Sequence, residues 1–243
     1  MFVVGDNMNQ EQLDRYYCSI YLKDIKEEGQ LKLLRSRVLV IGAGGLGSYV
    51  LPLLASSGVG FIGVVDNDIV NRNNLPRQTI YEYKDIGKYK VSVVKRRLER
   101  LNPDVHVKAY RSLLTKNNGR IVKEYDLVID CTDNFESKFL INDLCLKYHV
   151  PFITAGVSDY KGQVLTCIPG KTTDFKSIFD ELPINIDEKY KDDDGVFPSA
   201  VAIIGDIACN EALKYLLDIG TLLTDTLLVV DTLKNHYQKI KIK

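Results

Sequence analysis

The stretch RVLVIGAGGLGSYVLPLLASSGVGFIGVVD, residues 37–66, decides the fold of this 243-residue chain. Apart from Arg37, its first five residues are apolar and mostly β-branched, which predicts a short buried strand. A glycine-rich turn follows, then helical spacing at residues 48–57, and a second apolar strand that ends at Asp66. A strand, a glycine turn, a helix and another strand make a βαβ unit, so the stretch predicts a parallel sheet.

The same stretch has no charged residue from Val38 to Val65, which is long enough for a membrane span. It is interrupted by many glycines, by Pro52 and by serines, however, whereas a span requires sustained apolarity. The N-terminus, Met1 to Asn9, also lacks the basic region and apolar run of a signal peptide. We therefore expect no membrane-spanning segment and no secretory leader.

Strand and helix patterns alternate along the rest of the chain, which favours an α/β fold with helices on both faces of the sheet. We predict a doubly wound, mostly parallel, Rossmann-like sheet with an antiparallel C-terminal extension. Residues 1–243 are expected to form one domain, with a helical N-terminal segment at 1–35 and a mobile crossover loop at 169–195. The expected helices after residue 66 are 88–101, 138–148 and 198–217, and the expected strands are 105–110, 127–131, 151–157, 162–168, 226–231 and 236–243.

The composition is that of an ordinary globular protein, with 45% hydrophobic and 26% charged residues. Lys plus Arg equals Asp plus Glu, so the chain has no overall positive field and we expect no nucleic-acid partner. The five cysteines form no CxxC pair, which argues against a zinc site of the usual spacing. Their odd number favours reduced thiols and hence a cytoplasmic protein.

The glycines of the turn fit the pattern G-x-G-x-x-G at Gly42, Gly44 and Gly47, with Gly45 inside it. Glycines permit a tight turn and let a ligand approach the backbone where a Cβ atom would clash. Asp66 ends the second strand about twenty residues further on, where a carboxylate can accept hydrogen bonds from ribose hydroxyls. The unit therefore predicts a nucleotide site, but NAD and ATP both carry a ribose and both stay open at this point.

Three charged residues beyond the turn favour ATP over NAD. Arg77 offers a fork-shaped donor suited to terminal phosphate oxygens, and Lys90, at the start of a helix, could reach another phosphate. Asp133 follows the strand at 127–131, at the edge of a parallel sheet where ligands bind, and a carboxylate there suits Mg²⁺. Each also has an ordinary interpretation: a surface salt bridge for Arg77, a solvated helix position for Lys90 and a helix N-cap for Asp133.

Together these motifs resemble the MoeB/ThiF/HesA family, bacterial adenylyltransferases of ubiquitin-like sulfur-carrier proteins that are related to ubiquitin-activating enzymes. The resemblance extends from about Leu13 to Lys243, nearly the whole chain. It implies a doubly wound ThiF-type ATP-binding adenylation domain. The segments that carry it are RVLVIGAGGLGS, GVGFIGVVDNDIVNRNNLPRQ, DIGKYKV, LNPDV, DLVIDCTDN and GQVLT, which are specific as a group.

The resemblance implies that ATP and Mg²⁺ are the cofactors, that Arg77, Lys90 and Asp133 are catalytic, and that Asp133 binds the magnesium. Asp66 and Asp68 would contact the ribose and the side of the nucleotide that faces the metal. The phosphates would be contacted by Asn74, Arg77, Gln78 and Lys90, with Arg77 on the leaving pyrophosphate. The nucleotide-binding residues that it implies are Gly42, Gly44, Gly45, Gly47, Asp66, Asp68, Asn74, Arg77, Gln78 and Lys90.

The implied reaction is adenylyl transfer to the C-terminal glycine of a ThiS- or MoaD-like carrier that ends in Gly-Gly, with release of pyrophosphate, in thiamine or molybdopterin synthesis. The implied enzyme is thus a nucleotidyltransferase. Positioning of the reactants and neutralisation of phosphate charge would carry this catalysis, and the enzyme would need no nucleophile of its own.

The chain departs from the family pattern at three places. Relatives begin with R-Y-x-R-Q, whose second arginine reaches the ATP of the partner subunit across a dimer interface, but Cys18 stands at that position here. The first zinc-binding CxxC of many relatives falls on DFKS at 174–177, and the second would fall after the last residue, so we expect no zinc. Some relatives carry a thiol where this chain reads KYKDDDGVFP at 189–198, so we expect adenylation without a thioester or acyl-disulfide step.

Three other functions stay open. The chain could be the non-catalytic, nucleotide-binding scaffold of a two-chain activating enzyme, which Cys18 favours. It could adenylate a tRNA base, which the neutral charge balance disfavours. An NAD dehydrogenase would need a histidine or lysine that handles the hydride, and the sequence identifies none. Since relatives pair, we expect a homodimer, with the apolar helices around Leu51 and Val201 as a possible contact.

Overall fold

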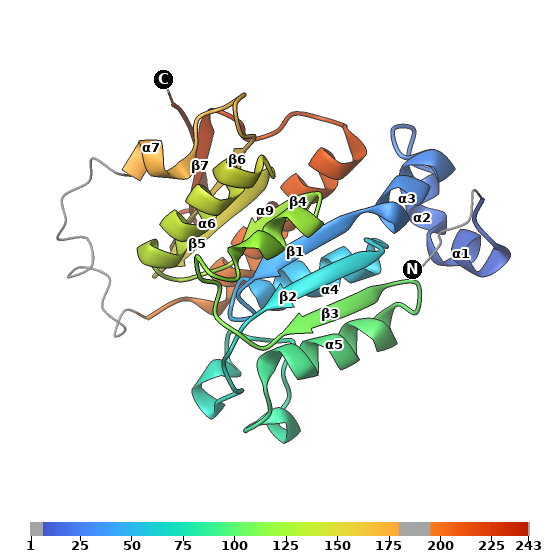
Figure 1. The fold of residues 1–243 in the computed structure, drawn as a ribbon, viewed down its shortest axis with the longest axis horizontal. Helices are drawn as coiled ribbons and strands as arrows, with labels where there is room; N and C mark the ends of the chain where they lie inside the picture. The colour runs from blue at the N-terminus through green and yellow to red at the C-terminus, as the bar shows by residue number, and fades with distance from the viewer. Residues whose placement is uncertain (1–6, 180–194, 243) are drawn as a thin grey trace.

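The fold is described from a computed structural model for residues 7–179 and 195–242 (Figure 1). An eight-stranded sheet with the order β3-β2-β1-β4-β5-β6-β7-β8 forms its middle layer. Neighbouring strands from β3 to β5 pair in parallel, and the remaining pairs to β8 are antiparallel. The strands are β1 (Arg37–Ile41), β2 (Phe61–Val65), β3 (His106–Tyr110), β4 (Leu127–Asp130), β5 (Phe152–Ser158), β6 (Lys161–Cys167), β7 (Thr226–Asp231) and β8 (His236–Lys241).

Helices cover both faces of the sheet (Figure 1). On one face α5 packs on β3, and α9 packs on α4, β5 and β6; on the other face α6 packs on β4 and β5 and contacts η3 and α7. The helices are α1 (Gln10–Arg15), α2 (Tyr17–Ile20), α3 (Lys26–Arg35), α4 (Gly47–Ser56), α5 (Lys90–Leu101), α6 (Phe135–Tyr148), α7 (Phe175–Phe179) and α9 (Pro198–Leu217), and the 3-10 helices are η1 (Arg72–Asn74), η2 (Tyr83–Asp85) and η3 (Gly119–Glu124).

The two cores of the molecule follow from the alternation of side chains along the strands. In β1, Val38 and Val40 belong to the core under α4 and α9, whereas Leu39 and Ile41 belong to the core under α6. All four residues are at most 4% exposed. A strand that is buried on both faces has a continuous apolar sequence, which is why RVLVI predicts its place in the middle of the sheet.

The predicted fold is confirmed, including the antiparallel extension that begins with β6. The helix at 198–217 and the strand at 226–231 have the predicted bounds. α6 begins at Phe135, earlier than predicted, because Asn134 caps it by accepting a hydrogen bond from the Ser137 N–H.

The N-terminal segment lies at the amino ends of the parallel strands, away from their carboxyl ends (Figure 1). Its anchor is Tyr16, which is 2% exposed and whose hydroxyl donates to Asp104, just before β3, at 2.9 Å. Arg15 forms an ion pair with the same carboxylate at 3.6 Å. In this structure, therefore, Arg15 does not reach the carboxyl-end edge of its own sheet.

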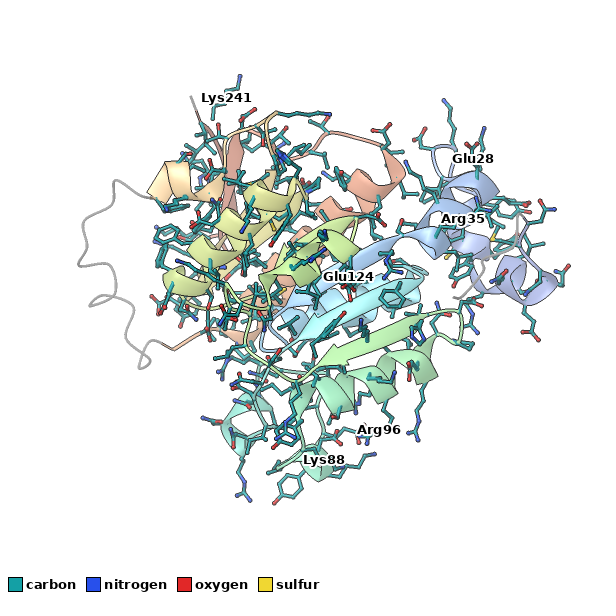
Figure 2. All side chains as sticks on the ribbon, viewed as in Figure 1. Glu28, Arg35, Lys88, Arg96, Glu124 and Lys241 are labelled. Carbon is teal, nitrogen blue, oxygen red and sulfur yellow. The ribbon has the colours of Figure 1, made fainter. Side chains whose placement is uncertain are left out.

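Most charged side chains surround this fold, as the labelled residues Lys88, Arg96 and Lys241 show in Figure 2. Within the described residues, the buried charged side chains are those of Asp85, Lys90, Asp130, Lys138 and Glu211. Each of them forms an ion pair. Two of these pairs lie at the carboxyl ends of parallel strands, where ligands of such sheets bind.

Leu51 and Val201 are 0% and 1% exposed in the core where α4 packs on α9, so these two side chains are not available to a partner subunit. A dimer contact through other faces of the two helices stays a prediction. Of the expected crossover loop, residues 169–179 contain the short helix α7, and residues 180–194 lie outside the described residues. The mobility of that loop stays a prediction.

Candidate nucleotide-binding site

The glycine turn between β1 and α4 requires glycine at two positions. Gly42 has a φ of +95°, and a Cβ atom on it would lie 2.7 Å from the carbonyl oxygen of Cys131. A Cβ atom on Gly47 would lie 2.3 Å from the carbonyl oxygen of Gly42. On Gly44, in contrast, a Cβ atom would meet only the Gln78 amide, at 3.7 Å. Gly42 and Gly47 therefore close the turn, and Gly44 leaves its backbone accessible to a ligand.

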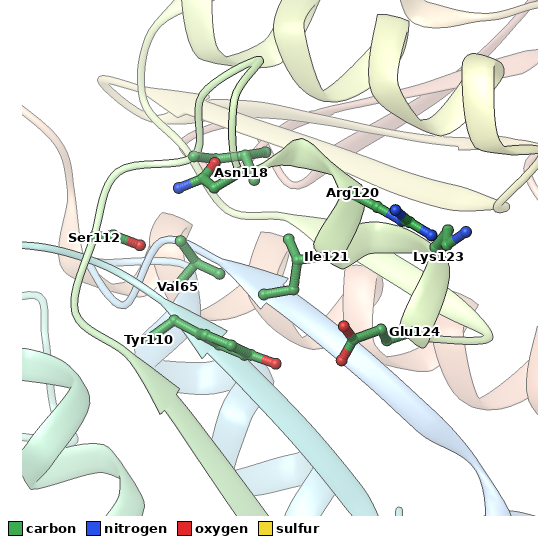
Figure 3. A pocket seen from close by; sticks show the side chains of 9 residues that line it. Val65, Tyr110, Ser112, Asn118, Arg120, Ile121, Lys123 and Glu124 are labelled. Atoms are coloured by element: carbon green, nitrogen blue, oxygen red, sulfur yellow. The ribbon is translucent and has the colours of Figure 1, made fainter.

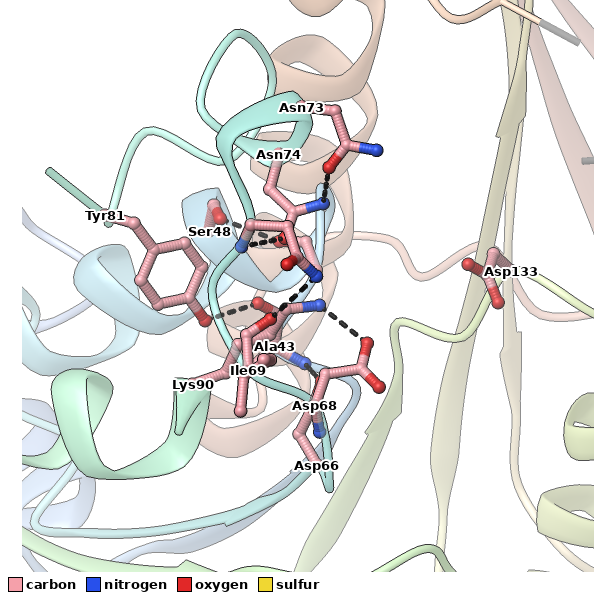
Figure 4. Close-up of polar contacts among 12 residues, drawn as sticks. Ala43, Ser48, Asp66, Asp68, Ile69, Asn73, Asn74, Tyr81, Lys90 and Asp133 are labelled. Carbon is pink, nitrogen blue, oxygen red and sulfur yellow. Dashed lines mark hydrogen bonds and ion pairs between the residues drawn. The ribbon is translucent and has the colours of Figure 1, made fainter. Parts of the chain in front are cut away.

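Asp66 holds this turn from the end of β2. Its carboxylate accepts hydrogen bonds from the backbone N–H groups of Ala43 at 2.7 Å and Asp68 at 2.8 Å. The Tyr81 hydroxyl donates to the Ala43 carbonyl at 2.6 Å, so the turn is tied on a second side (Figure 4). Burial raises the pKa of Asp66, and the two N–H groups and the nearby Lys90 charge partly offset that rise.

Lys90, the first residue of α5, lies next to these aspartates (Figure 4). It is 4% exposed, and its Nζ donates to the Asp68 carboxylate at 2.8 Å. The interpretation of Lys90 as a solvated helix residue is therefore wrong. The Asp68 side chain is 60% exposed, so this ion pair is buried at the lysine and open to solvent at the carboxylate.

Two buried amides line the loop that follows η1. Asn74 is 8% exposed, and its amide oxygen accepts from the Asn71 N–H at 3.0 Å, so its side chain holds the loop. Gln78 is 4% exposed, and its Oε1 has no hydrogen-bond partner among the described residues. The Nε2 atom of the same amide lies beside the accessible Gly44. An amide with an unpartnered oxygen at the edge of the turn fits a bound ligand, because buried amides are normally satisfied.

Arg77 lies between these amides and is partly exposed. Its guanidinium donates to the Asn73 carbonyl at 3.1 Å, and no described carboxylate forms a salt bridge with it. The interpretation of Arg77 as one half of a surface salt bridge therefore finds no support in the described part of the chain. The guanidinium keeps further donors for an anionic ligand.

Asp133 stands apart from the group around Lys90 (Figure 4). It is exposed, and its carboxylate accepts a hydrogen bond from the neighbouring Asn134 amide at 3.2 Å. Because Asn134 and not Asp133 caps α6, the interpretation of Asp133 as an N-cap is wrong. Among the residues that the structure describes, no three His, Cys, Asp or Glu side chains could hold a metal together. One or two carboxylates completed by phosphate oxygens and water are the ligands that Mg²⁺ usually takes.

The starts of four helices meet at this edge of the sheet. α4 begins in the glycine turn, α5 begins at Lys90 and α6 begins just after Asp133. In the first turn of α9, Val201 lies 2.9 Å from the position of a Cβ atom on Gly45. Since the N-terminus of a helix carries a partial positive charge and free N–H groups, this arrangement favours an anionic ligand such as a phosphate.

A cavity of 540 Å³ lies between the end of β3 and η3, and Val65, the residue before Asp66, forms part of its wall (Figure 3). The Asp66 N–H donates to the Tyr110 carbonyl at 3.2 Å, which links the cavity wall to the turn. The sequence analysis missed this cavity because segments far apart in the chain form it. Its lining residues are Val65, Tyr110, Ser112, Leu114, Asn118, Arg120, Ile121, Lys123 and Glu124.

The sequence analysis also missed an ion pair between Asp130 and Lys138, with a distance of 3.0 Å between Nζ and Oδ2. The two side chains are 1% and 7% exposed at the end of β4, just before Asp133. The available signal was an aspartate that ends the apolar strand LVID, followed by a lysine on the next helix.

The described residues contain no helix with the length and hydropathy needed to cross a bilayer. The five cysteines are free thiols, of which Cys18 is exposed and the others are buried. Burial raises the pKa of the buried thiols, which leaves them protonated and unreactive at neutral pH. These buried residues are Cys131, Cys145, Cys167 and Cys209.

Relatives with this sequence pattern are adenylyltransferases and an activating enzyme. A sulfur carrier protein adenylyltransferase of Thermus thermophilus is 37% identical over 240 residues, which cover 96% of this chain and 89% of the relative. A probable molybdopterin-synthase adenylyltransferase of Gracilaria tenuistipitata var. liui is 34% identical, with 99% of this chain and 68% of the relative covered. The SAMP-activating enzyme E1 of Haloferax volcanii is 34% identical, with 96% and 87% covered.

Solved structures share the fold. The structure of E. coli MccB with ATP has a TM-score of 0.81 and 22% identity, and the match covers 98% of this chain and 72% of MccB. At that identity the likeness establishes the fold alone. Residues 16–243 match the ThiF family, as the resemblance of the motifs predicts. With these relatives, the match shows that the chain belongs to the ThiF family.

Proposed function

We propose that this chain is an ATP-dependent adenylyltransferase that activates the C-terminal glycine of a ubiquitin-like sulfur-carrier protein and releases pyrophosphate. The names of the relatives confirm the predicted enzyme class, an adenylyltransferase. The observation that carries the proposal is the group at the glycine turn. There Asp66, Asp68 and Lys90 are joined by hydrogen bonds, and the unsatisfied Gln78 amide lies beside the accessible Gly44.

The site fits each part of ATP. The accessible backbone at Gly44 and the start of α4 suit the phosphates, with Lys90 and Arg77 as the nearby cations. Asp66 can accept hydrogen bonds from the ribose hydroxyls. The cavity beside it, with Tyr110 in its wall, offers an apolar and aromatic surface for the adenine.

The proposed reaction forms a bond between a carboxylate oxygen of the carrier and the α-phosphorus. The bond from that phosphorus to the pyrophosphate oxygen breaks, and the electron pair leaves with pyrophosphate. Lys90 and Arg77 would neutralise the charge that develops on the phosphate oxygens, and no side chain of the enzyme has to act as a nucleophile. A bound Mg²⁺, for which Asp133 and the exposed Asp68 are the candidate ligands, would supply further positive charge at the phosphates.

An apolar surface for the carrier lies close to this site. The rings of Tyr160 and Phe197 are 5.3 Å apart, and the two residues are 42% and 49% exposed. Phe197 immediately precedes α9, about one helical turn before Val201, which meets the glycine turn. A carrier bound at these rings would have its C-terminal tail near the phosphates.

The proposal has finer parts that rest on the resemblance. Mg²⁺ is the proposed metal, thiamine or molybdopterin synthesis the proposed pathway, and the cytoplasm the proposed location, which the free thiols support. A homodimer is also proposed, with a contact outside the buried α4–α9 packing. No zinc and no thioester step are included.

The test is ATP–pyrophosphate exchange with purified ThiS- and MoaD-like carriers that end in Gly-Gly. We expect exchange that depends on the carrier and on Mg²⁺, and an AMP–carrier adduct in mass spectra. A carrier that lacks its last glycine is the matched control and should give none. If no carrier supports exchange although the protein binds ATP, the adenylylation proposal is wrong; restoration by a second chain would instead identify a scaffold subunit.

A further inference from the structure

The carboxylate of Asp130 is enclosed by side chains from three elements. Lys138, on α6, donates from Nζ to Asp130 Oδ2 at 3.0 Å and to the Ala155 carbonyl on β5 at 2.7 Å. Thr154, also on β5, donates from its hydroxyl to the same carboxylate oxygen at 2.7 Å. The pair thus joins the end of β4 and the middle of β5 to the first turn of α6.

The other oxygen of Asp130 holds the turn that carries Asp133. Thr132 donates to Oδ1 twice, from its backbone N–H at 2.9 Å and from its hydroxyl at 2.6 Å. The residue between them, Cys131, packs with its carbonyl against Gly42, where a Cβ atom would approach it to 2.7 Å. One carboxylate therefore fixes both the residue before Asp133 and a wall of the glycine turn.

Stability alone gives a poor reason for this arrangement. Two charges have been removed from water, and well-packed apolar side chains of similar volume are often as stable as a buried ion pair. The charged pair instead fixes the orientation of the Asp130 carboxylate, because hydrogen bonds are directional. With Lys138 and both threonines as donors, the carboxylate has all its hydrogen bonds satisfied in one orientation, and the turn before Asp133 has one conformation.

We propose that Lys138 is a positioning residue of the adenylylation reaction. It orients Asp130, which orients the Thr132 turn, so that the Asp133 carboxylate is presented to the metal-bound phosphates of ATP. The inference rests on the function proposed above, because it assigns Mg·ATP to Asp133. Groups that hold a metal-binding side chain in place typically change metal affinity or activity by about 10- to 100-fold when they are removed.

The chain offers a matched control pair away from the proposed site. Glu211, on α9, is 2% exposed and accepts hydrogen bonds from the Thr166 hydroxyl and the Leu223 N–H, both at 2.7 Å. Lys214 forms an ion pair with it and donates to the Thr221 carbonyl at 2.6 Å. Like Lys138, Lys214 therefore binds one buried carboxylate and one carbonyl oxygen.

The experiment compares Lys138→Met, Lys138→Arg, the double variant Asp130→Asn with Lys138→Met, and Lys214→Met in the full chain. Calorimetry measures the affinity for ATP with and without Mg²⁺, and electron paramagnetic resonance measures Mn²⁺ binding in the presence of a non-hydrolysable ATP analogue. Kinetics separate KM for Mg·ATP from kcat. Thermal unfolding records the stability of each variant.

We expect Lys138→Met to weaken Mg·ATP and Mn²⁺ binding by about 10-fold or more, with metal-free ATP affinity nearly unchanged. Lys138→Arg should restore most of this loss. Lys214→Met should lower the unfolding temperature without changing the metal dependence. If Lys138→Met fails to fold, the double variant replaces it in the test, because it leaves no unpaired buried charge. The double variant should still lose metal affinity.

The inference is overturned if folded Lys138→Met, or the double variant where the single one does not fold, binds Mg·ATP and Mn²⁺ as the unaltered protein does. It is also overturned if Lys214→Met shows the same loss of metal affinity, since the effect would then follow from stability alone. These outcomes are distinct from a failure of the proposed function, in which the unaltered protein binds Mg·ATP but forms no AMP–carrier adduct.

Discussion

Two lysine–aspartate pairs at the same edge of the sheet differ in one respect. In the first pair Asp68 follows β2 and Lys90 begins α5; in the second, Asp130 ends β4 and Lys138 lies on α6. Their N–O distances are 2.8 and 3.0 Å. Both lysine side chains are buried, at 5% and 7% exposure. The aspartates differ, because the Asp68 side chain is 60% exposed and that of Asp130 is 1% exposed.

Because of this difference in exposure, the ion pair between Lys90 and Asp68 (the open pair) can break when a ligand binds. The ion pair between Lys138 and Asp130 (the closed pair) cannot. Asp68 can be solvated by water when Lys90 turns to another anion, so the pair contributes little to stability and leaves Lys90 available to a phosphate. Asp130 has no access to water, so Lys138 has to stay with it. We therefore assign ligand binding to the open pair and the fixing of geometry to the closed pair.

The largest expected effect is the loss of protein stability when the closed pair is broken. Lys138→Met should lower the free energy of unfolding by about 3–5 kcal/mol, because it leaves the Asp130 carboxylate buried without a counter-charge. Lys90→Met should cost no more than about 1 kcal/mol, because Asp68 is exposed. Urea unfolding of both variants measures the difference, and equal losses would remove the distinction between the pairs.

The next largest effect is the loss of catalytic turnover when Lys90 of the open pair is replaced. Lys90→Met should lower kcat for adenylylation by about 10²–10³-fold, as the loss of one preorganised group that stabilises transition-state charge usually does. Steady-state pyrophosphate exchange measures it, with Lys88→Met as the control on the neighbouring exposed lysine. An unchanged kcat would mean that Lys90 does not neutralise the phosphates.

A smaller loss is expected at Arg77, whose guanidinium donates only to the Asn73 carbonyl among the described hydrogen bonds. Arg77→Ala removes a charge-assisted hydrogen bond of about 1.5–3 kcal/mol and should therefore reduce turnover by about one to two powers of ten. Arg77→Lys keeps the charge but not the fork and should recover part of it. Turnover equal to that of the unaltered protein would contradict the role on the leaving pyrophosphate.

The smallest effect concerns thiol reactivity next to the two pairs. In the unaltered protein and in Lys90→Met, only Cys18 should react with iodoacetamide, since burial raises the pKa of Cys131, beside Asp130. Lys138→Met should make Cys131 slowly reactive as the closed pair loosens. Mass spectrometry of the modified peptides measures this. Labelling of Cys131 in the unaltered protein would show that the closed pair opens by itself.

Local sequence patterns predicted one part of this site well. The glycine turn, the strand that ends at Asp66 and the helix that contains Lys90 lie next to one another in the chain, and their spacing fixes their geometry. The resemblance added Asp68, Asn74 and Gln78, of which Gln78 has the unsatisfied oxygen. The same reasoning offered the helices around Leu51 and Val201 as a possible dimer contact, although both side chains are buried, because an apolar helix in isolation does not reveal whether another helix covers it.

Other features depended on residues that meet only in the folded chain. The cavity near Asp66 requires η3 to lie against the end of β3, and the closed pair requires Thr154 of β5 to reach Asp130 of β4. No periodicity encodes such contacts. The exposure of Asp68 and the burial of Asp130 likewise result from which elements pack around two similar carboxylates.

The order of residues was therefore sufficient to establish a parallel sheet, its glycine turn and the family, because each depends on backbone geometry and short-range spacing. Packing between distant elements alone determined which charges are shielded from water. The strength and mobility of an ion pair depend on that shielding, so the difference between the Lys90 pair and the Lys138 pair, on which their proposed roles rest, is a property of the folded chain.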